Sequence, residues 1–148
     1  MIGRAITELV SKDYQKMHEY AEKCILLNYE LGSCHFYLGI SKIYLKEFDE
    51  GKKEIKIAKE KGYYTETKGS LDMQADAYEK MKDYKNLAEV YENYIKLDYN
   101  NAQYHSSLAF VYSLIGEYNK ARQEAMIVLE LSPEAKENVD AFLKTLPY

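Results

Sequence analysis

The sequence predicts an all-α fold built from a repeated helical hairpin, and three observations carry this prediction. Apolar residues recur three and four positions apart, which is the spacing of one face of a helix. The 148 residues include only two Pro and seven Gly, and Glu, Lys, Leu and Ala, which favour helix, are abundant. A pattern of residue types also returns about every 34 positions, as in proteins made of stacked repeats.

The clearest copy of the pattern lies between Ala102 and Pro133. Its fixed positions are His105, Leu108, Ala109, Tyr112, Gly116, Tyr118, Ala121, Ala125, Val128, Leu129, Leu131 and Pro133. They predict two amphipathic helices joined by a turn at Gly116 and Glu117. The small residues at 109, 121 and 125 allow the two helix backbones to approach closely, and the larger residues fill the space around this contact.

Three earlier copies share the pattern with less regularity. The third copy keeps Ala75, Tyr78, Tyr84, Ile95 and Leu97, the second keeps Leu38, Gly39, Phe48, Gly51, Ile55 and Ala58, and the first keeps Ala5, Tyr14, Met17, Ala21, Cys24 and Ile25. Gln74, Lys82, Leu87, Tyr94 and Tyr99 depart from the pattern, and the bulk of Tyr91 and Tyr94 indicates that the third hairpin is spaced differently from its neighbours. Two residues are inserted after the second copy, near Gly62, which should end a helix.

The expected helices follow from these copies. They cover residues 2–11, 14–27, 32–46, 48–61, 66–81, 84–97, 101–115, 118–131 and 133–145. The first eight form four hairpins at 1–31, 32–67, 68–101 and 102–132, within a single domain that comprises residues 1–148. The helix at 48–61 carries charges three and four positions apart and should be an outer surface. The helix at 133–145 is apolar on one side and polar on the other, as a capping helix must be.

The charge and hydropathy of the chain exclude two classes of partner. Its formal net charge is −4, and acidic and basic residues are interleaved, so a basic face for nucleic acid is not expected. No apolar run reaches the 18 residues of a membrane span, so direct membrane insertion is not expected either. We expect a soluble domain, cytoplasmic by default, although the sequence does not specify a compartment.

Two cysteines and three histidines are the candidates for special chemistry. Cys24 and Cys34 are too few for a disulfide scaffold and form no zinc motif with a histidine, so free buried thiols are the first expectation. A disulfide between consecutive helices is the alternative, and it would need an oxidising compartment. His35 and His105 occupy the same position in two copies, which favours a structural role. His18 is expected at the surface or at the edge of its helix rather than as a ligand.

Enzyme motifs are not found. The chain has no Gly-rich phosphate loop, no helical pair of metal-binding histidines and no local signature of a Ser-His-Asp arrangement. The sequence therefore predicts no enzyme, no metal site and no cofactor. A hydrolase or transferase would instead require a pocket with convergent ionisable groups.

The order of residue types between Ala102 and Pro133 resembles the tetratricopeptide repeat (TPR), a helix-turn-helix unit of about 34 residues. This resemblance implies about four tandem repeats wound into a right-handed superhelix, or solenoid. It also implies a concave groove, lined by the first helix of each repeat, that binds a peptide or helix of another protein. The implied function is that of a protein-binding scaffold.

The inward-facing positions of the TPR pattern imply a set of groove residues. The partner-binding candidates are Ile6, Phe36, Tyr37, Ile40, Tyr44, Asp72, Asp76 and Phe110. For the apolar residues of the first two repeats, packing against neighbouring helices is an equal alternative, whereas Phe36 and Phe110 are expected in the groove. A basic segment of the partner is expected opposite the acidic residues of the third repeat.

A second hypothesis is structural. The short first repeat would leave a stacking face uncovered, so the domain would form a homodimer or dock on a missing part of a larger protein. The run from Val139 to Pro147 is similar to the tails of repeat domains attached to bacterial membrane glycan polymerases. The domain would then be an accessory of a membrane-attached protein.

Overall fold

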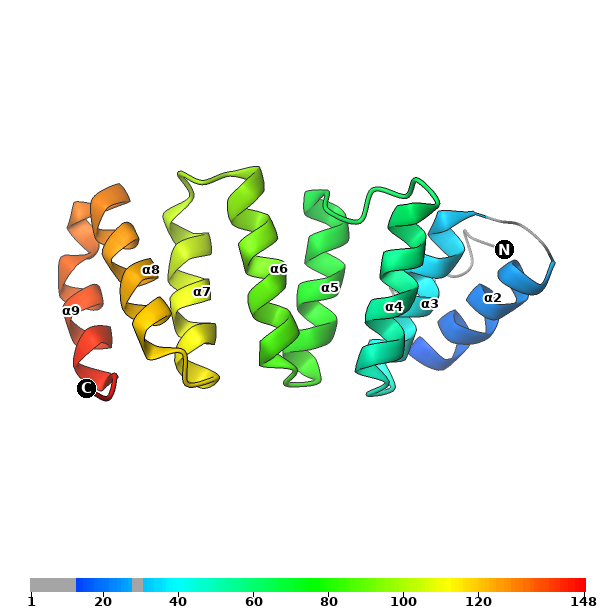
Figure 1. Ribbon diagram of the computed structural model, residues 1–148, viewed down its shortest axis with the longest axis horizontal. Coiled ribbons are helices and arrows are strands. Elements are labelled where there is room, and N and C mark those ends of the chain that lie inside the picture. Colours follow the sequence, from blue (N-terminus) through cyan, green and yellow to red (C-terminus); the bar gives the residue numbers. More distant parts are fainter. Residues whose placement is uncertain (1–12, 28–30) are drawn as a thin grey trace. The chain divides into compact units, whose positions relative to one another are not determined.

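The computed structural model describes residues 13–27 and 31–148, and every regular element in these ranges is a helix. The predicted all-α class is confirmed. The expected helix at 2–11, and with it Ile6, lies outside the described residues. The chain divides into two compact units, Met1–Lys82 and Asp83–Tyr148, which are described separately (Figure 1).

The first unit contains four described helices: α2 (Tyr14–Leu26), α3 (Gly32–Tyr44), α4 (Phe48–Glu60) and α5 (Lys68–Lys80). Side-chain caps fix two of their starts. The Asp13 carboxylate accepts a hydrogen bond from the Lys16 backbone N–H at 3.1 Å, and the Thr67 hydroxyl accepts one from the Ser70 N–H at 3.3 Å. The predicted helix at 66–81 therefore begins two residues later than expected.

The second unit contains α6 (Tyr84–Leu97), α7 (Ala102–Leu114), α8 (Tyr118–Leu131), the short 3₁₀ helix η1 (Pro133–Ala135) and α9 (Lys136–Thr145). Side-chain oxygens of Asp83 and Asn101 cap α6 and α7. Pro133 starts η1, where its missing N–H and fixed φ are tolerated. The predicted bounds of all described helices agree with the structure to within two residues, apart from this 3₁₀ start of the capping segment.

The helices of a hairpin approach closely at the small residues that the sequence singles out. A Cβ added to Gly39 of α3 would lie 2.7 Å from the Gly51 carbonyl oxygen of α4, and a Cβ added to Gly51 would lie 2.8 Å from the Gly39 oxygen. The second unit has Ala109 and Ala121 at these positions, and both are buried. The predicted contact between small residues is confirmed in the α3–α4 hairpin.

The turns of the α3–α4 and α7–α8 hairpins each contain a residue with a positive φ, but the residue types differ. Gly116, between α7 and α8, has φ = +80°, a conformation that glycine adopts without steric cost. Lys46 occupies the corresponding place between α3 and α4 and has φ = +66°. A lysine in this left-handed region is strained by about 1 kcal/mol, and its position explains why α3 ends two residues before the predicted bound.

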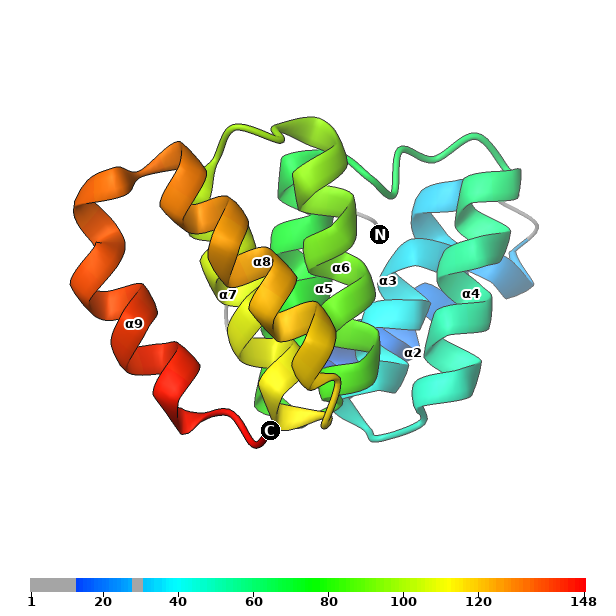
Figure 2. The ribbon, with the colours of Figure 1, turned by 60° about the vertical axis from the view of Figure 1, so that its left-hand side comes forward.

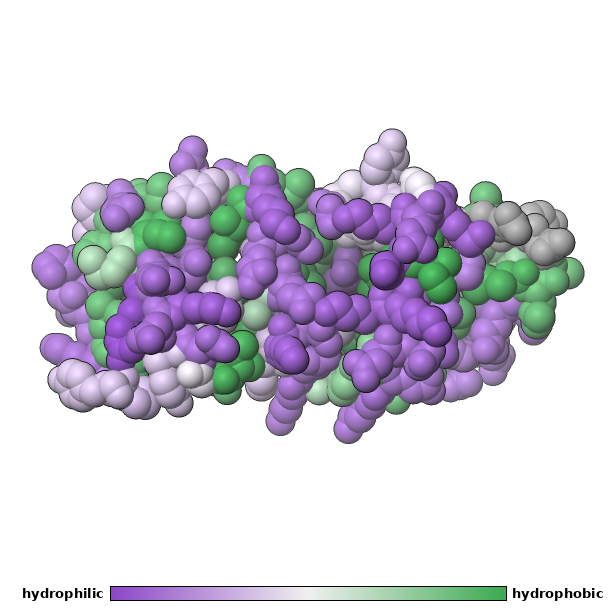
Figure 3. Space-filling model, viewed as in Figure 1, coloured by the Kyte–Doolittle hydropathy of each residue, from purple (hydrophilic) through white to green (hydrophobic). Residues whose placement is uncertain are grey.

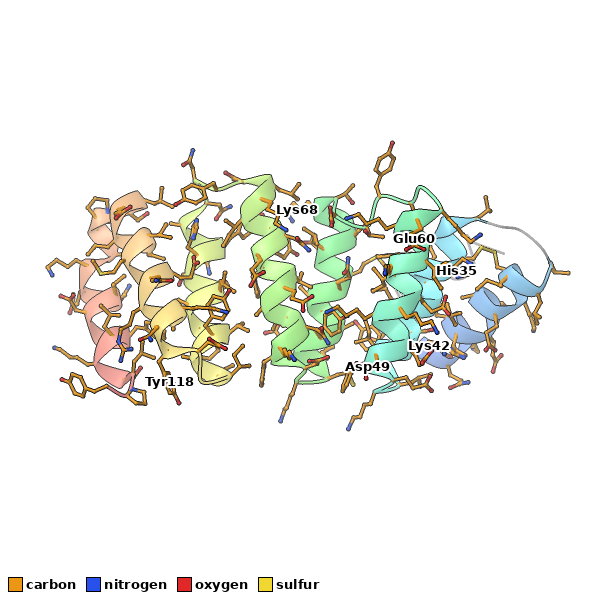
Figure 4. All side chains as sticks on the ribbon, viewed as in Figure 1. His35, Lys42, Asp49, Glu60, Lys68 and Tyr118 are labelled. Atoms are coloured by element: carbon orange, nitrogen blue, oxygen red, sulfur yellow. A yellow bond between two sulfur atoms is a disulfide. The ribbon has the colours of Figure 1, made fainter. Side chains whose placement is uncertain are left out.

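The outward face of α4 is charged, as the spacing of its side chains predicts. Lys52, Lys53, Lys56, Lys59 and Glu60 are all outside the buried core. Figure 4 shows Asp49 and Glu60 near opposite ends of α4, and hydrophilic side chains cover this helix in Figure 3. The buried residues Gly51, Ile55 and Ala58 form its inner face, so α4 is an amphipathic helix with a solvated outer surface.

A disulfide joins Cys24 of α2 to Cys34 of α3. The expectation of free thiols is therefore wrong, and the alternative of a bridge between consecutive helices is what the structure contains. The packing of α2 on α3 brings the two Cα atoms to 6.0 Å, within the usual range for a disulfide.

Candidate functional site

Four of the apolar groove candidates lie in the core of the first unit. Phe36 and Ile40 have no exposed surface, and Tyr37 and Tyr44 are also buried. The Phe36 ring packs on the rings of Tyr63 and Tyr37, with centroids 4.9 and 5.7 Å apart. The expectation that Phe36 lines an open groove is therefore corrected: neighbouring aromatic rings enclose it.

Tyr44 belongs to a polar cluster that connects three helices of the first unit. Its hydroxyl donates a hydrogen bond to Asp76 of α5, and its ring stacks on Tyr14 of α2 with centroids 3.4 Å apart. Burial, and then the bond to Asp76, raise the pKa of Tyr44 far above its usual value, so it remains a neutral donor. The arrangement holds α3 in place rather than presenting Tyr44 to a ligand.

The two acidic candidates of α5 already have basic partners. Asp72 accepts from Lys68 at 2.9 Å, and Asp76 accepts from Lys80 at 2.7 Å, each pair four residues apart on the helix. Residues 1–82 contain equal numbers of acidic and basic side chains, so the formal net charge of −4 falls entirely on residues 83–148. The uncompensated acidic charge thus lies in the second unit and not around Asp72 and Asp76.

Phe110 is the one groove candidate in the described chain whose side chain is both apolar and open to solvent, with 56% of its surface exposed. It is part of the lining of an open cleft of about 480 Å³, which we call the α7–α9 cleft. The cleft is lined by Ala102, Gln103, Ser106, Ala109, Phe110, Ala125, Val128, Ser132, Glu134, Ala135, Asn138, Val139 and Phe142. All of these residues belong to the second unit.

The floor of the α7–α9 cleft is apolar and its rim is polar. Ala109, Ala125, Val128 and Val139 form a buried cluster against which Phe142 packs. The rim carries the hydroxyls and amides of Ser106, Ser132, Gln103 and Asn138, together with the exposed carboxylate of Glu134. Among the described residues that line the cleft, only Glu134 is ionisable. The apolar floor can hold an apolar group of a ligand, and the polar rim can form hydrogen bonds around it. The described lining residues include no acid–base pair.

The α7–α9 cleft is open because α9 packs closely on α8 and η1 but not on α7. In the first unit, by contrast, α3 packs against α5. His35 and His105 mark corresponding positions, and in this register Ser106 takes the place of Phe36. The buried ring of Phe36, which packs on Tyr63 in the segment before α5, thus has no counterpart at Ser106 of α7. The sequence itself shows this difference, because Ser106 occupies an inward-facing position at which the second repeat has Phe36.

The far end of α9 is anchored to the α7–α8 hairpin. The Leu146 side chain is buried, and the Arg122 guanidinium donates a hydrogen bond to the Pro147 carbonyl oxygen. Figure 2 shows the chain leaving the end of α8 through η1 and α9 and returning toward the α7–α8 turn. The packing of η1 on α8 at one end and the Arg122–Pro147 hydrogen bond at the other thus hold the helix that forms the outer wall of the cleft.

The two histidines predicted to be structural make matching bonds across their hairpins. His105 Nδ1 lies 2.6 Å from the Glu124 carboxylate and His35 Nδ1 lies 2.7 Å from that of Glu54, each pair 19 residues apart. His105 Nε2 also donates to the Tyr99 carbonyl oxygen at 2.7 Å, because a carbonyl can only accept. These pairs join the helices of a hairpin, and neither histidine lines the cleft.

No family model matches the chain, and no curated protein is significantly similar to it. Within residues 13–27 and 31–148, no cluster of His, Cys, Asp or Glu is arranged to hold a metal ion. No described helix is long and apolar enough to cross a membrane. The α7–α9 cleft, where the exposed Phe110 lies beside a buried apolar cluster, is the candidate functional site.

Proposed function

We propose that this protein is a protein-interaction module of the TPR type, whose repeats continue one another as a right-handed solenoid. In this proposal the α7–α9 cleft is the part of the concave groove that receives a peptide or helix of a partner protein. The observation that supports it most directly is the exposure of Phe110 above a floor of buried apolar residues.

The composition of the cleft fits a protein interface. Interfaces combine a central apolar patch, often with aromatic residues, and a rim of polar groups that form hydrogen bonds to the partner. Phe110 and Phe142 supply the aromatic residues here, and the amides of Gln103 and Asn138 can each donate to and accept from a peptide backbone. Covering Phe110 would remove apolar surface from water at a gain of roughly 25 cal/mol for each Å².

The proposal can be tested before any partner is identified. A random peptide library displayed on phage is selected against the immobilised protein, and the dissociation constants of the recovered peptides are measured by calorimetry. We expect Phe110→Ser to weaken these peptides at least tenfold, because it removes the exposed ring without disturbing buried residues. Met126→Ser is the matched control, since Met126 is an exposed apolar residue of α8 outside the cleft.

Two outcomes would contradict the proposal. One is recovery of peptides that bind the Phe110→Ser and Met126→Ser variants equally well, which would place binding elsewhere. The other is a dimer, detected by light scattering over a dilution series, that the Phe110→Ser change dissociates. The cleft would then be a contact between two copies of this chain.

A further inference from the structure

The first unit shows what fills the space between a hairpin and the helix that follows it. Phe36 projects from α3 with no exposed surface, and its ring packs on Tyr63, which precedes α5. Leu71 of α5 is also fully buried. The chain thus closes this space with its own aromatic side chains.

The second unit leaves the equivalent space unfilled. Ser106 stands at the position of Phe36, and it lines a cleft of about 480 Å³ instead of filling it. An engineered apolar cavity of about 150 Å³ is known to bind benzene, so the cleft is large enough for an aromatic ring. Phe110 and Phe142 contribute aromatic surface to the lining, against which a third ring can pack, and Val128 and Val139 contribute an aliphatic floor.

The negative charge around the cleft favours aromatic ligands that carry a positive charge. Glu134 contributes a carboxylate to the lining, and no Lys, Arg or His lies among the described lining residues. The neighbouring Lys136 is directed to Asp140, with 2.8 Å between its ammonium nitrogen and the carboxylate oxygen. Because residues 83–148 also carry the whole net charge of −4, a cationic group beside the ring is favoured and a carboxylate is disfavoured.

We infer that the α7–α9 cleft is a receptor for an aromatic side chain of a partner peptide that carries a Lys or Arg next to this residue. The ring takes the place that Phe36 fills in the first unit, the cation lies beside Glu134, and the peptide backbone bonds to Gln103 and Asn138. This inference rests on the proposed function and specifies the chemistry of the partner.

The first experiment uses two small probes that share a ring and linker but differ in charge, phenethylammonium and 3-phenylpropionate. Each is titrated into the full chain while amide and methyl NMR signals are followed. We expect both probes to shift the signals of Ala109, Val128 and Val139. Phenethylammonium should bind several-fold, and up to about tenfold, more tightly. Glu134→Gln should remove this preference and leave binding of the ring.

A second experiment fills the cleft from within. Ser106→Phe should restore the ring that α3 possesses and abolish binding of phenethylammonium, whereas Ser113→Phe, on the same helix but outside the lining, should leave binding unchanged. Ser106→Leu provides a smaller filler in case the phenylalanine variant does not fold, and it should also block the probe. Unchanged binding to a folded Ser106→Phe or Ser106→Leu variant would overturn the inference.

The peptides selected from the library separate the inference from the proposed function. Cleft-binding peptides enriched in Phe, Tyr or Trp next to Lys or Arg would support both. Cleft-binding peptides without an aromatic residue, or with acidic neighbours, would overturn the inference and leave the proposed function standing. A library that yields no peptide sensitive to Phe110→Ser would overturn both.

Discussion

The segments α3–α4–α5 and α7–α8–α9 have the same order of helices and the same His–Glu bond across the hairpin, yet one is closed and the other open. In the first, Phe36 and Tyr63 occupy the space between the hairpin and the next helix. In the second, Ser106 leaves this space as a cleft with Phe110 at its edge. The hairpin thus determines the scaffold, while one inward-facing side chain decides whether the scaffold has a core or a binding surface.

Removing the buried ring of the first segment should change stability the most. Phe36→Ser should lower the free energy of unfolding by about 3–5 kcal/mol, because it deletes a fully buried ring, and should open a second cleft that binds phenethylammonium. Phe110→Ser should cost less than about 1 kcal/mol, since its ring is already half in water. Urea denaturation of both variants measures the difference, and equal losses would show that the two positions are not core and surface.

The His–Glu pairs should also differ in strength. His105→Phe should cost about 3 kcal/mol, because it leaves Glu124 and the Tyr99 carbonyl without the ring nitrogens of a residue that is only 1% exposed. His35→Phe should cost less, since this histidine and Glu54 are both partly open to water. The same denaturation assay compares them, and a larger loss for His35→Phe would contradict the difference in burial.

The disulfide belongs to the first unit alone. Reducing it, or replacing Cys24 and Cys34 with Ser, should lower the stability of α2 and α3 by about 2–3 kcal/mol, the value for a short closed loop. Hydrogen exchange measures this loss, and α7 and α8 should exchange as before. Alkylation of both cysteines in the absence of a reductant, detected by mass spectrometry, would show that the bridge is absent.

Changes in the turns should have a smaller effect. Lys46→Gly should raise the free energy of unfolding by up to about 1 kcal/mol, because glycine adopts a positive φ without strain. Gly116→Lys should lower it by a similar amount. Thermal unfolding of the two variants should therefore shift in opposite directions, and a shift in the same direction would mean that backbone strain does not decide the outcome.

Most of the helices can be predicted from the sequence because the same pattern of residue types recurs in each repeat. Lys46 and Lys82 alone are weak evidence for a turn, because this turn position prefers glycine. Gly116 at the corresponding position of another repeat identifies the turn in all three hairpins. The start of α5 is among the least accurate bounds within the hairpins, because the inserted residues before it have no counterpart in the other repeats.

The site is harder to predict because it depends on neighbours that no repeat pattern specifies. The pattern assigns Phe36 to the groove, but Tyr63, in the inserted segment, encloses it. The pairing of Asp72 with Lys68 and of Asp76 with Lys80 follows from a spacing of four residues and could have been predicted. Phe110 is exposed, as its position in the pattern indicates, whereas the cleft beside it depends on where α9 lies, which the amphipathic pattern of α9 does not define.

The anchoring of α9 by the packing of η1 on α8 and by the Arg122–Pro147 hydrogen bond should lower the entropic cost of filling the α7–α9 cleft. A helix that is fixed at both ends keeps the wall of the cleft in place before any ligand arrives, so little conformational entropy is lost when the cleft is occupied. The free energy of burying an incoming side chain is then available as affinity. Association can proceed without a slow conformational step, and changes in the partner should alter mainly its rate of dissociation.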